Sequence, residues 1–263
     1  TVKKIIVPSY STKNIFLNTY KDLTIEVVEH GYDKINGKPN NDNPDKKKNK
    51  LYIVVPCYNE EQVLGETSKR LKIKCENLIQ KGQISKDSKI VFVDDGSKDR
   101  TWKMISELHE TDPLFSGVKL SRNRGHQNAL LAGLTMASEY ADMAISMDAD
   151  LQDDINAVDQ MIEKYYEGCD IVYGVRSARE TDTFFKRFTA EAFYKLINKM
   201  GGEIVYNHAD YRLMSNRALK GLLEFDEVNI FLRGMVPMIG YKSDIVTYER
   251  AERFAGESKY PLK

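Results

Sequence analysis

From Leu51 onward, short apolar runs alternate with amphipathic stretches, and this pattern predicts the secondary structure. The runs expected to form strands are 51–56, 89–93, 117–120, 143–147 and 171–174. The stretches expected to form helices are 60–80, 99–110 and about 125–139. Strands that alternate with helices predict an α/β domain with a Rossmann-like, mostly parallel sheet flanked by helices.

The first 50 residues differ in texture from the rest of the chain. Two β-prone runs, 4–7 and 23–28, precede the segment 36–48, which is rich in Asn, Pro and Lys and cannot bury a core. We therefore expect an N-terminal extension over 1–50, made of a small hairpin or arm followed by a flexible linker. The lysines at 46–48 could contact a membrane surface, but a solvated linker is the simpler interpretation.

Composition excludes several classes of protein. Lys plus Arg and Asp plus Glu both number 39, which is unlike a general nucleic-acid binder. The three cysteines, Cys57, Cys75 and Cys169, are odd in number and form no Cys-x-x-Cys pair, which argues against a disulfide framework and a zinc site and fits a reducing compartment. No run of about 18 apolar residues and no signal-peptide pattern is present in the sequence.

Polar clusters follow four successive predicted strands. They lie at 56–61, 94–97, 121–126 and 148–150. Ligands bind at the carboxyl ends of the strands in sheets of this kind. Single carboxylates such as Asp99 and Asp154 are interpreted as helix caps, but capping does not explain four clusters at four strand ends. The sequence therefore predicts a ligand site at this edge of the sheet.

The cluster at 148–152, Asp-Ala-Asp-Leu-Gln, carries the chemistry. Two carboxylates this close repel each other unless a hard cation lies between them, and Gln152 offers a further oxygen. A metal bridging Asp148, Asp150 and a substrate diphosphate would stabilise a leaving phosphate. The sequence contains neither Gly-x-Gly-x-x-Gly nor Gly-x-x-x-x-Gly-Lys-Ser/Thr, which disfavours a dehydrogenase and an ATPase.

Several ordered motifs resemble family 2 glycosyltransferases of the GT-A fold. These motifs are V-P-C-Y-N-E-E at 55–61, V-D-D-G-S-x-D-x-T at 93–101 and D-A-D-L-Q-D at 148–153. Two more are similar to the polyprenyl-phosphate branch, which includes dolichyl-phosphate mannose synthase and the bactoprenol glucosyltransferases: L-S-R-N-R-G-H-Q at 120–127 and A-D-Y-R-L-M-S at 209–215. The closing R-A-E-R-F-A-G-E-S-K-Y at 250–260 is more similar to the bacterial members. The resemblance covers about residues 51–263.

The resemblance implies a role for each matching residue. It implies metal binding by Asp148, Asp150 and Gln152, with Asp150 and Asp210 as catalytic residues. It implies an acceptor-phosphate site made of Arg176, Arg253 and Lys259, with Arg187 as a looser match. It implies donor binding by Pro56, Tyr58, Asn59, Glu60, Asp94, Asp95, Ser97 and Asp148. The sequence departs from the family pattern at Arg124 and at 153–155. Because these positions are not the metal-binding ones, the departures bear on substrate specificity and not on the type of reaction.

The implied reaction is the inverting transfer of a hexose to undecaprenyl phosphate, with UDP-glucose as the expected donor and Mg²⁺ or Mn²⁺ as cofactor. A phosphate acceptor with a second pKa of about 6 is already nucleophilic, so Asp210 is expected to orient groups more than to remove a proton. Arg176 and Arg253 are expected to hold the acceptor anion.

Alternatives remain open. They are a glycosyltransferase acting on a glycan or protein, and a non-catalytic nucleotide-sugar-binding module. A processive synthase is disfavoured because the only tryptophan, Trp102, is not in a Gln-x-x-Arg-Trp motif. We expect a catalytic domain over 51–240 and a basic segment over 241–263 that leads towards the membrane. We also expect the natural chain to continue into transmembrane helices, so that the catalytic domain lies at the cytoplasmic face of the membrane. A homo-oligomer is possible, and no nucleic acid is expected as partner.

Overall fold

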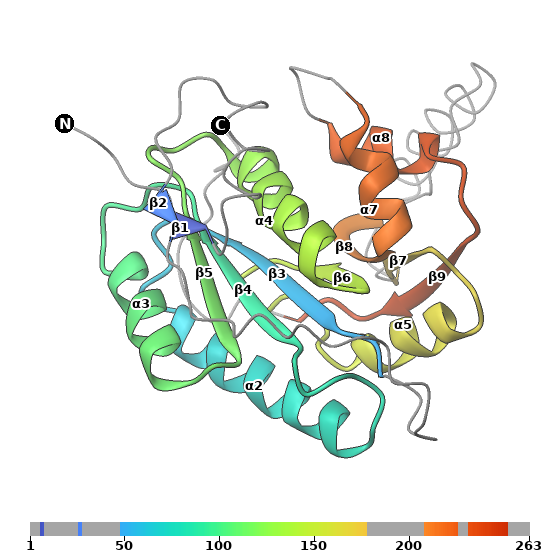
Figure 1. Cartoon of the computed structure of the whole chain (residues 1–263), viewed down its shortest axis with the longest axis horizontal. Helices are drawn as coiled ribbons and strands as arrows, with labels where there is room; N and C mark the ends of the chain where they lie inside the picture. The colour runs from blue at the N-terminus through green and yellow to red at the C-terminus, as the bar shows by residue number, and fades with distance from the viewer. Residues whose placement is uncertain (1–5, 8–25, 28–47, 178–207, 226–230, 252–263) are drawn as a thin grey trace, which may run out of the picture.

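The structure is a computed structural model, and it describes residues 6–7, 26–27, 48–177, 208–225 and 231–251 (Figure 1). Most of the described residues belong to a seven-stranded sheet and the helices that cover it. Its strands are β3 (Leu51–Cys57), β4 (Lys89–Asp94), β5 (Phe115–Lys119), β6 (Met143–Ser146), β7 (Ile171–Arg176), β8 (His208–Ser215) and β9 (Ser243–Tyr248).

The strand order is β5-β4-β3-β6-β8-β7-β9. Every pair of neighbours is parallel except the two pairs that contain β8, which runs antiparallel to β6 and to β7. The predicted mostly parallel sheet is therefore confirmed. The reversal of β8 brings its N-terminal end, rather than its C-terminal end, to the edge where the other strands finish.

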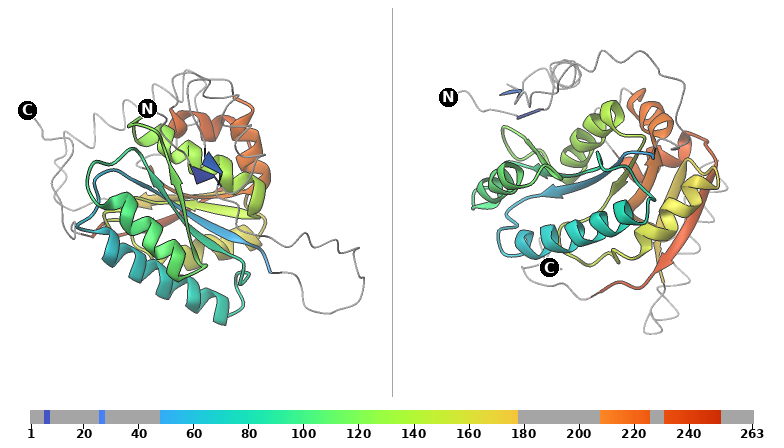
Figure 2. Two further views of the ribbon diagram at one scale, coloured as in Figure 1. Left: turned by 60° about the vertical axis from the view of Figure 1, so that its left-hand side comes forward. Right: turned by 60° about the horizontal axis from the view of Figure 1, so that its bottom comes forward.

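Helices cover both faces of the sheet (Figures 1 and 2). One face carries α4 (His126–Tyr140), α7 (Asn216–Leu223) and α8 (Leu232–Met238). The other face carries α2 (Leu64–Gln80), α3 (Thr101–Thr111) and α5 (Ala157–Tyr166). This three-layer arrangement encloses two apolar cores, one on each side of the sheet.

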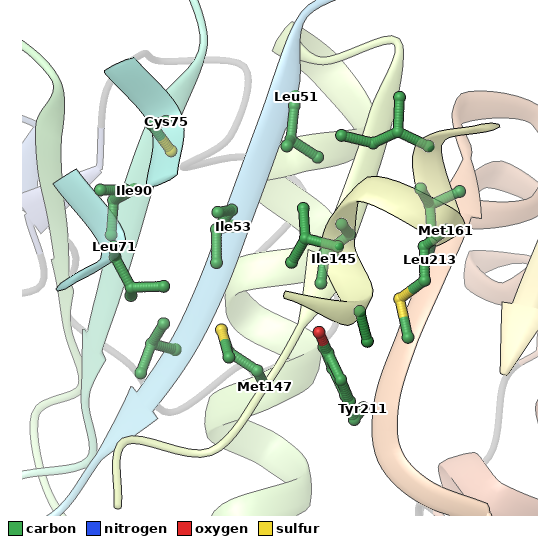
Figure 3. Packing of buried hydrophobic residues seen from close by; sticks show 14 of the residues in the cluster. Leu51, Ile53, Leu71, Cys75, Ile90, Ile145, Met147, Met161, Tyr211 and Leu213 are labelled. Atoms are coloured by element: carbon green, nitrogen blue, oxygen red, sulfur yellow. The ribbon is translucent and has the colours of Figure 1, made fainter. Parts of the chain in front are cut away.

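Period-two alternation along β3 explains why both faces are apolar. Leu51, Ile53 and Val55 pack in the core under α2, whereas Tyr52 and Val54 pack under α4. Strands buried on both faces are continuously apolar, as parallel strands between two helical layers must be. Figure 3 shows the α2 side of this core, where side chains of β3, β4, β6 and β8 meet those of α2 and α5.

The boundaries of two predicted helices shift at their N-termini. The helix expected from residue 60 begins at Leu64, because Glu60 accepts backbone hydrogen bonds from Val63 and Leu64 in a turn that precedes it. The next helix begins at Thr101 rather than at residue 99. In the described part of the chain, no helix is long and apolar enough to cross a bilayer.

The N-terminal extension contains two short strands, β1 (Ile6–Val7) and β2 (Glu26–Val27), and these pair in parallel. Of the two expected forms, the hairpin is therefore wrong, because hairpin strands are antiparallel, and the arm stays a prediction. The expected linker at 36–48 lies almost wholly outside the described residues. At the other end, β9 pairs with β7, so the segment assigned to 241–263 begins inside the sheet, and the expected division of the chain stays a prediction.

Candidate functional site

The carboxyl ends of β3, β4 and β6 meet at one edge of the sheet, as the strand-end clusters predicted. Cys57 at the end of β3 lies opposite Asp94 at the end of β4. The backbone N–H of Asp95 donates to the Cys57 carbonyl at 2.8 Å, and that of Met147 donates to Val54 at 3.1 Å. The polar loops that follow these strands therefore start side by side.

The loops after β3 and β4 are joined by reciprocal hydrogen bonds. The Asn59 N–H donates to Ser97 Oγ at 2.9 Å, and the Lys98 N–H donates back to Asn59 Oδ1 at 2.8 Å. The Glu60 N–H donates to Thr101 Oγ1 at 2.8 Å. Asn59 has a positive φ of 53°, a conformation that asparagine tolerates better than most residues. The structure thus brings together Asn59, Glu60 and Ser97, three of the predicted donor-binding residues.

Three other residues of these loops occupy different environments. Pro56 is buried within β3, whereas Tyr58 is half-buried beyond its end. Asp99 accepts from the Thr101 N–H at 3.0 Å and from the Glu61 N–H at 3.1 Å. It therefore binds the first N–H group of α3, although the N-cap position itself is Arg100 and not Asp99. An open pocket beside these loops is lined by Asn59, Glu61, Gln62, Lys98 and Asp99.

The adjacent acids Asp94 and Asp95 differ in their partners. Asp94 is fully buried, and while its Oδ1 accepts from the Ser97 N–H at 3.1 Å, its Oδ2 has no hydrogen-bond partner among the described residues. Burial raises the pKa of the Asp94 carboxyl. An unpaired buried oxygen costs about 1 to 3 kcal/mol, so this acceptor suits a donor group from a ligand.

Asp95 instead holds the loop that precedes α4. Its two carboxylate oxygens accept from the backbone N–H groups of Arg124 at 2.7 Å and Gly125 at 2.9 Å. Gly96 follows with φ of 69°, and a Cβ there would lie 2.6 Å from the backbone of Arg122. Glycine is required at this position because the two loops touch through their backbones. Both carboxylate oxygens of Asp95 thus already accept backbone hydrogen bonds, and donor binding by Asp95 stays a prediction.

The Asp148 and Asp150 pair lies in a tight turn after β6. Leu151 has φ of 59°, and Asp150 Oδ1 accepts from the Gln152 N–H at 3.1 Å. Burial among neighbouring groups, together with repulsion from Asp153, raises the pKa of Asp148 to about 6, although 39% of its side chain is exposed. A left-handed backbone at a non-glycine residue and crowded carboxylates are both costly and are typical of functional turns.

The donor set of this turn fits a divalent cation in part. Within the residues that the structure describes, no three His, Cys, Asp or Glu side chains converge on one point. Two carboxylates with oxygens from a diphosphate would complete the coordination of a hard cation, since Mg²⁺ is commonly held this way. Gln152, the third predicted ligand, accepts a hydrogen bond from Arg250 Nη2 through Oε1, and its carbonyl accepts from the Ala251 N–H at 3.0 Å.

Arg176 lies beside this turn and contacts Tyr248 and Asp153, and its role in acceptor binding stays a prediction. The register of β7 and β9 places it opposite Tyr248, and Arg176 Nε donates to the Tyr248 hydroxyl at 3.2 Å. Asp153, whose side chain is 1% exposed, accepts from Tyr248 at 2.6 Å and lies 3.5 Å from Arg176 Nη2. Asp153 and Tyr248 were not foreseen, and no sequence signal paired them. Arg187, Arg253 and Lys259 lie outside the described residues.

Asp210, at the start of β8, is the centre of a second network. Its Oδ1 accepts from Arg212 Nη2 at 2.6 Å, and its Oδ2 accepts from Gln127 Nε2 at 3.1 Å. Arg233 on α8 donates to both oxygens, at 3.3 and 3.2 Å. The Nε2 atom of His126 lies 3.5 Å from Asp210 and 3.8 Å from Asp148, so it connects the two acidic groups.

The charges around Asp210 fix its protonation state. Burial raises the pKa of Asp210, but the hydrogen bond with His126 and the charges of Arg212 and Arg233 outweigh burial and hold that pKa well below its usual range. The same contact raises the pKa of His126 in spite of its burial. A carboxylate that holds its proton so weakly is a poor base and a good anchor.

Sequence reasoning gave no individual role to four members of this network, although the first lies in the predicted strand-end cluster at 121–126: His126, Gln127, Arg212 and Arg233. The first two belong to the 120–127 motif and Arg212 to the 209–215 motif, so the signal for three of them was their place in a recognised motif. No sequence signal distinguished Arg233, which comes from a helix more than 20 residues after Asp210.

Comparison with known proteins gives a consistent result. The family model described as "Glycosyl transferase family 2" matches residues 52–223. The uncharacterized glycosyltransferase YkoT of Bacillus subtilis is 57% identical over 213 residues, which cover 81% of this chain and 63% of YkoT. The prophage bactoprenol glucosyl transferase homolog of Escherichia coli is 42% identical over 212 residues, covering 80% of this chain and 67% of that protein. The chain therefore spans about two thirds of the length of these relatives.

Solved structures share the fold at low identity. The mannosyltransferase PcManGT of Pyrobaculum calidifontis, solved in complex with GDP-Man and Mn²⁺, aligns with a TM-score of 0.52 and 18% identity over 82% of this chain and 62% of its own. Its likeness supports the three-layer α/β architecture and the GT-A fold expected from the sequence.

Proposed function

Because this chain belongs to glycosyl transferase family 2, a glycosyltransferase family, we propose that it transfers glucose from UDP-glucose to a polyprenyl phosphate, inverting the anomeric centre. The observation that carries the proposal is the arrangement of Asp148, His126 and Asp210. One imidazole lies within 3.8 Å of the predicted metal-binding carboxylate and within 3.5 Å of the Asp210 carboxylate. A donor whose diphosphate is bound at Asp148 would thus present its sugar towards Asp210.

The polyprenyl phosphate is proposed from the relatives and from the motifs. Relatives named as bactoprenol glucosyl transferases are 40–42% identical over 80% of this chain. These relatives are named for bactoprenol, and the motifs of this chain at 120–127 and 209–215 resemble the polyprenyl-phosphate branch. We propose that the full-length protein acts at the cytoplasmic face of the membrane, where such a lipid phosphate would be exposed.

On the donor side, we assign Asp94 to the nucleoside and Asp148 with Asp150 to the metal and diphosphate. The buried, unpaired Oδ2 of Asp94 is suited to a base or ribose donor group. When bound, Mg²⁺ or Mn²⁺ would supply positive charge to the departing diphosphate. The turn at Leu151 sets the direction of both carboxylates, and the contacts of Asp153 with Tyr248 and Arg176 hold the next residues of that turn in place.

On the acceptor side, we assign Asp210 an orienting role. A phosphate monoester is largely dianionic at neutral pH and needs no strong base. Asp210 is ionised and engaged by Arg212, Arg233 and Gln127, which supports anchoring of neighbouring groups rather than proton removal. Holding the phosphate near the sugar C1 would lower the barrier by fixing the reacting geometry.

The test is transfer of labelled glucose by the full-length protein. UDP-[¹⁴C]glucose is incubated with undecaprenyl phosphate and either Mg²⁺, Mn²⁺ or EDTA, and the label is followed into the lipid phase. We expect a lipid-linked product with metal only, and its anomeric proton should report a β-linkage. Asp150→Asn should lower kcat at least about 100-fold. The control is Asp159→Asn on α5, which removes a carboxylate that pairs with Lys74 of α2, and this variant should have the kcat of wild type.

Two results would contradict the proposal. Label that enters a glycan or protein added to a parallel reaction, but never the lipid, would favour a glycosyltransferase that acts on such an acceptor. Binding of UDP-glucose without turnover on any acceptor would favour a non-catalytic module.

A further inference from the structure

Asp210 accepts hydrogen bonds from two arginines, although the charge of one arginine is enough to neutralise its carboxylate. Arg212 comes from the same strand, its side chain is 2% exposed, and it donates to Asp210 at 2.6 Å. Arg233 comes from α8, its side chain is 45% exposed, and its two bonds to Asp210 are longer, at 3.2 and 3.3 Å. The buried arginine is therefore the structural partner, and the half-exposed one is an additional cation.

The additional cation lies at the site but is not needed to hold Asp210. Without Arg233, Asp210 would keep the hydrogen bonds from Arg212 and Gln127 and the contact with His126. Asp210 and the two arginines together carry one net positive charge. Because His126 lies between Asp148 and Asp210, this charge is separated from the predicted metal turn by one side chain. A net cation so placed suits an anion that approaches from the side of Asp210.

Two large apolar side chains near this cation in the sequence are exposed. Phe231, which precedes α8, is 58% exposed, and Met238, the last residue of α8, is 70% exposed. The Phe231 ring lies over Gly234, where a Cβ would come within 2.7 Å of Phe231 Cδ1. A phosphate joined to a hydrocarbon chain offers a charged group for Arg233 and an apolar group for Phe231, which lies two residues before it in the chain, whereas a free phosphate offers only the first.

We propose that Arg233 binds the phosphate of the isoprenyl phosphate acceptor, with Phe231 contacting the adjoining isoprene unit. This inference rests on the proposed function and adds a residue to its acceptor site. Arg233 would exchange one or both of its bonds to Asp210 for the acceptor oxygens, and its planar fork can bind two of them at once. Asp210 would then set the position of the guanidinium before the acceptor arrives.

The test measures binding of farnesyl phosphate to the full-length protein, with UDP and MnCl₂ present, by isothermal titration calorimetry. Arg233→Gln should raise the Kd for farnesyl phosphate by about 10- to 100-fold, the range expected for loss of a charged hydrogen bond. The Kd for UDP should not change. Arg233→Lys should fall between the two, because a single ammonium replaces a fork.

A matched control removes an arginine from the neighbouring helix. Arg217 on α7 is 66% exposed and pairs with Asp170, so Arg217→Gln deletes the same charge from another carboxylate partner. It should leave both Kd values unchanged. Phe231→Ala should weaken farnesyl phosphate and leave the weaker binding of inorganic phosphate as it is, which separates a lipid phosphate from a free one.

Double substitution separates direct binding from an effect through Asp210. If Arg233 touches the acceptor, then Arg233→Gln should still raise the Kd when Asp210→Asn is already present. If Arg233 only positions Asp210, the second substitution should add nothing, and the inference would be overturned. The melting temperature of each variant, measured by calorimetry, identifies any that fail to fold.

Failure of the inference differs from failure of the proposed function. Wild-type protein that binds farnesyl phosphate and glucosylates the lipid, while Arg233→Gln binds it equally well, would overturn the role of Arg233 alone. Wild-type protein that neither binds farnesyl phosphate nor transfers glucose to a lipid would overturn both.

Discussion

Replacing Asp210 by asparagine removes a negative charge on which a buried arginine depends. Arg212 has a side chain that is 2% exposed, and Asp210 has one that is 8% exposed, so neither is well solvated. The Arg212 Nε already lacks a hydrogen-bond partner among the described residues. In Asp210→Asn, the guanidinium would keep one amide oxygen as acceptor and lose its counter-charge.

The size of the effect follows from the burial of the pair. Removing one partner of a buried ion pair typically destabilises a protein by about 3 to 5 kcal/mol. Asparagine retains an acceptor and the half-exposed Arg233 can turn to solvent, so we expect the lower end, about 3 kcal/mol. For a domain of this size, about 2 to 4 °C are lost for each kcal/mol, which gives a decrease in Tm of about 6 to 12 °C.

The assay is thermal unfolding by differential scanning calorimetry at pH 7.5 in the absence of ligand. The control is Asp244→Asn, which breaks a pair with Lys164 that has the same 2.6 Å separation but lies at the surface, with side chains 40% and 29% exposed. Exposed pairs contribute little, so this variant should melt close to wild type. Equal Tm values for the two variants would refute the argument that burial, rather than distance, decides the contribution.

The pH dependence gives a second check on Asp210. Because the pKa of Asp210 is lower in the folded protein than in the unfolded chain, its ionised form stabilises the fold above the unfolded pKa of about 3.9. That contribution is lost as the pH falls below this value towards the folded pKa. The difference in stability between wild type and Asp210→Asn should therefore grow slightly as the pH falls from 8 to about 5, because Asp210 also raises the pKa of His126, and it should shrink below about pH 4. A difference that shrinks between pH 8 and 6 would contradict the assigned ionisation.

Three further outcomes are expected. Gly133→Ala in α4 should lower the free energy of unfolding by about 1 to 3 kcal/mol, because the new Cβ would lie 2.3 Å from Val54 Cγ1. Gly65→Ala in α2, whose Cβ would have no atom nearer than 4.0 Å, should leave this free energy unchanged or raise it slightly. Urea unfolding measures both. Burial raises the pKa of the Cys75 thiol to about 12, and since all three cysteines are buried, Ellman's reagent should titrate none of them in the native protein and three after denaturation. Mn²⁺ with UDP should raise the Tm of wild type and leave that of Asp150→Asn nearly unchanged; equal increases would place the metal elsewhere.

Some features of the site could be predicted because they are local in sequence. The strand that ends at Asp94 and the turn of Asp148 and Asp150 follow apolar runs, and parallel strands must finish at a common edge. Residue types alone then indicate a cation and a diphosphate at that edge. The roles assigned to the individual side chains stay predictions.

Other features could not be predicted because they depend on pairing between distant segments. Asp210 reaches the site from the start of a strand, which follows from the antiparallel placement of β8 between β6 and β7. Asp95 was expected to bind the donor, yet its oxygens hold the loop at 124–125. The register of β7 with β9 turns Arg176 towards Tyr248 and Asp153.

The sequence by itself determined the alternation of strands and helices from residue 51 to 147 and the acidic turn at 148–152, since periodicity and composition act over a few residues. Only the tertiary structure decided which charges neutralise one another. Arg212 and Arg233 are both arginines of one sequence, but burial makes the first a structural counter-ion and exposure leaves the second available to an anion. That difference depends on solvent access, which is settled when β8 and α8 pack together.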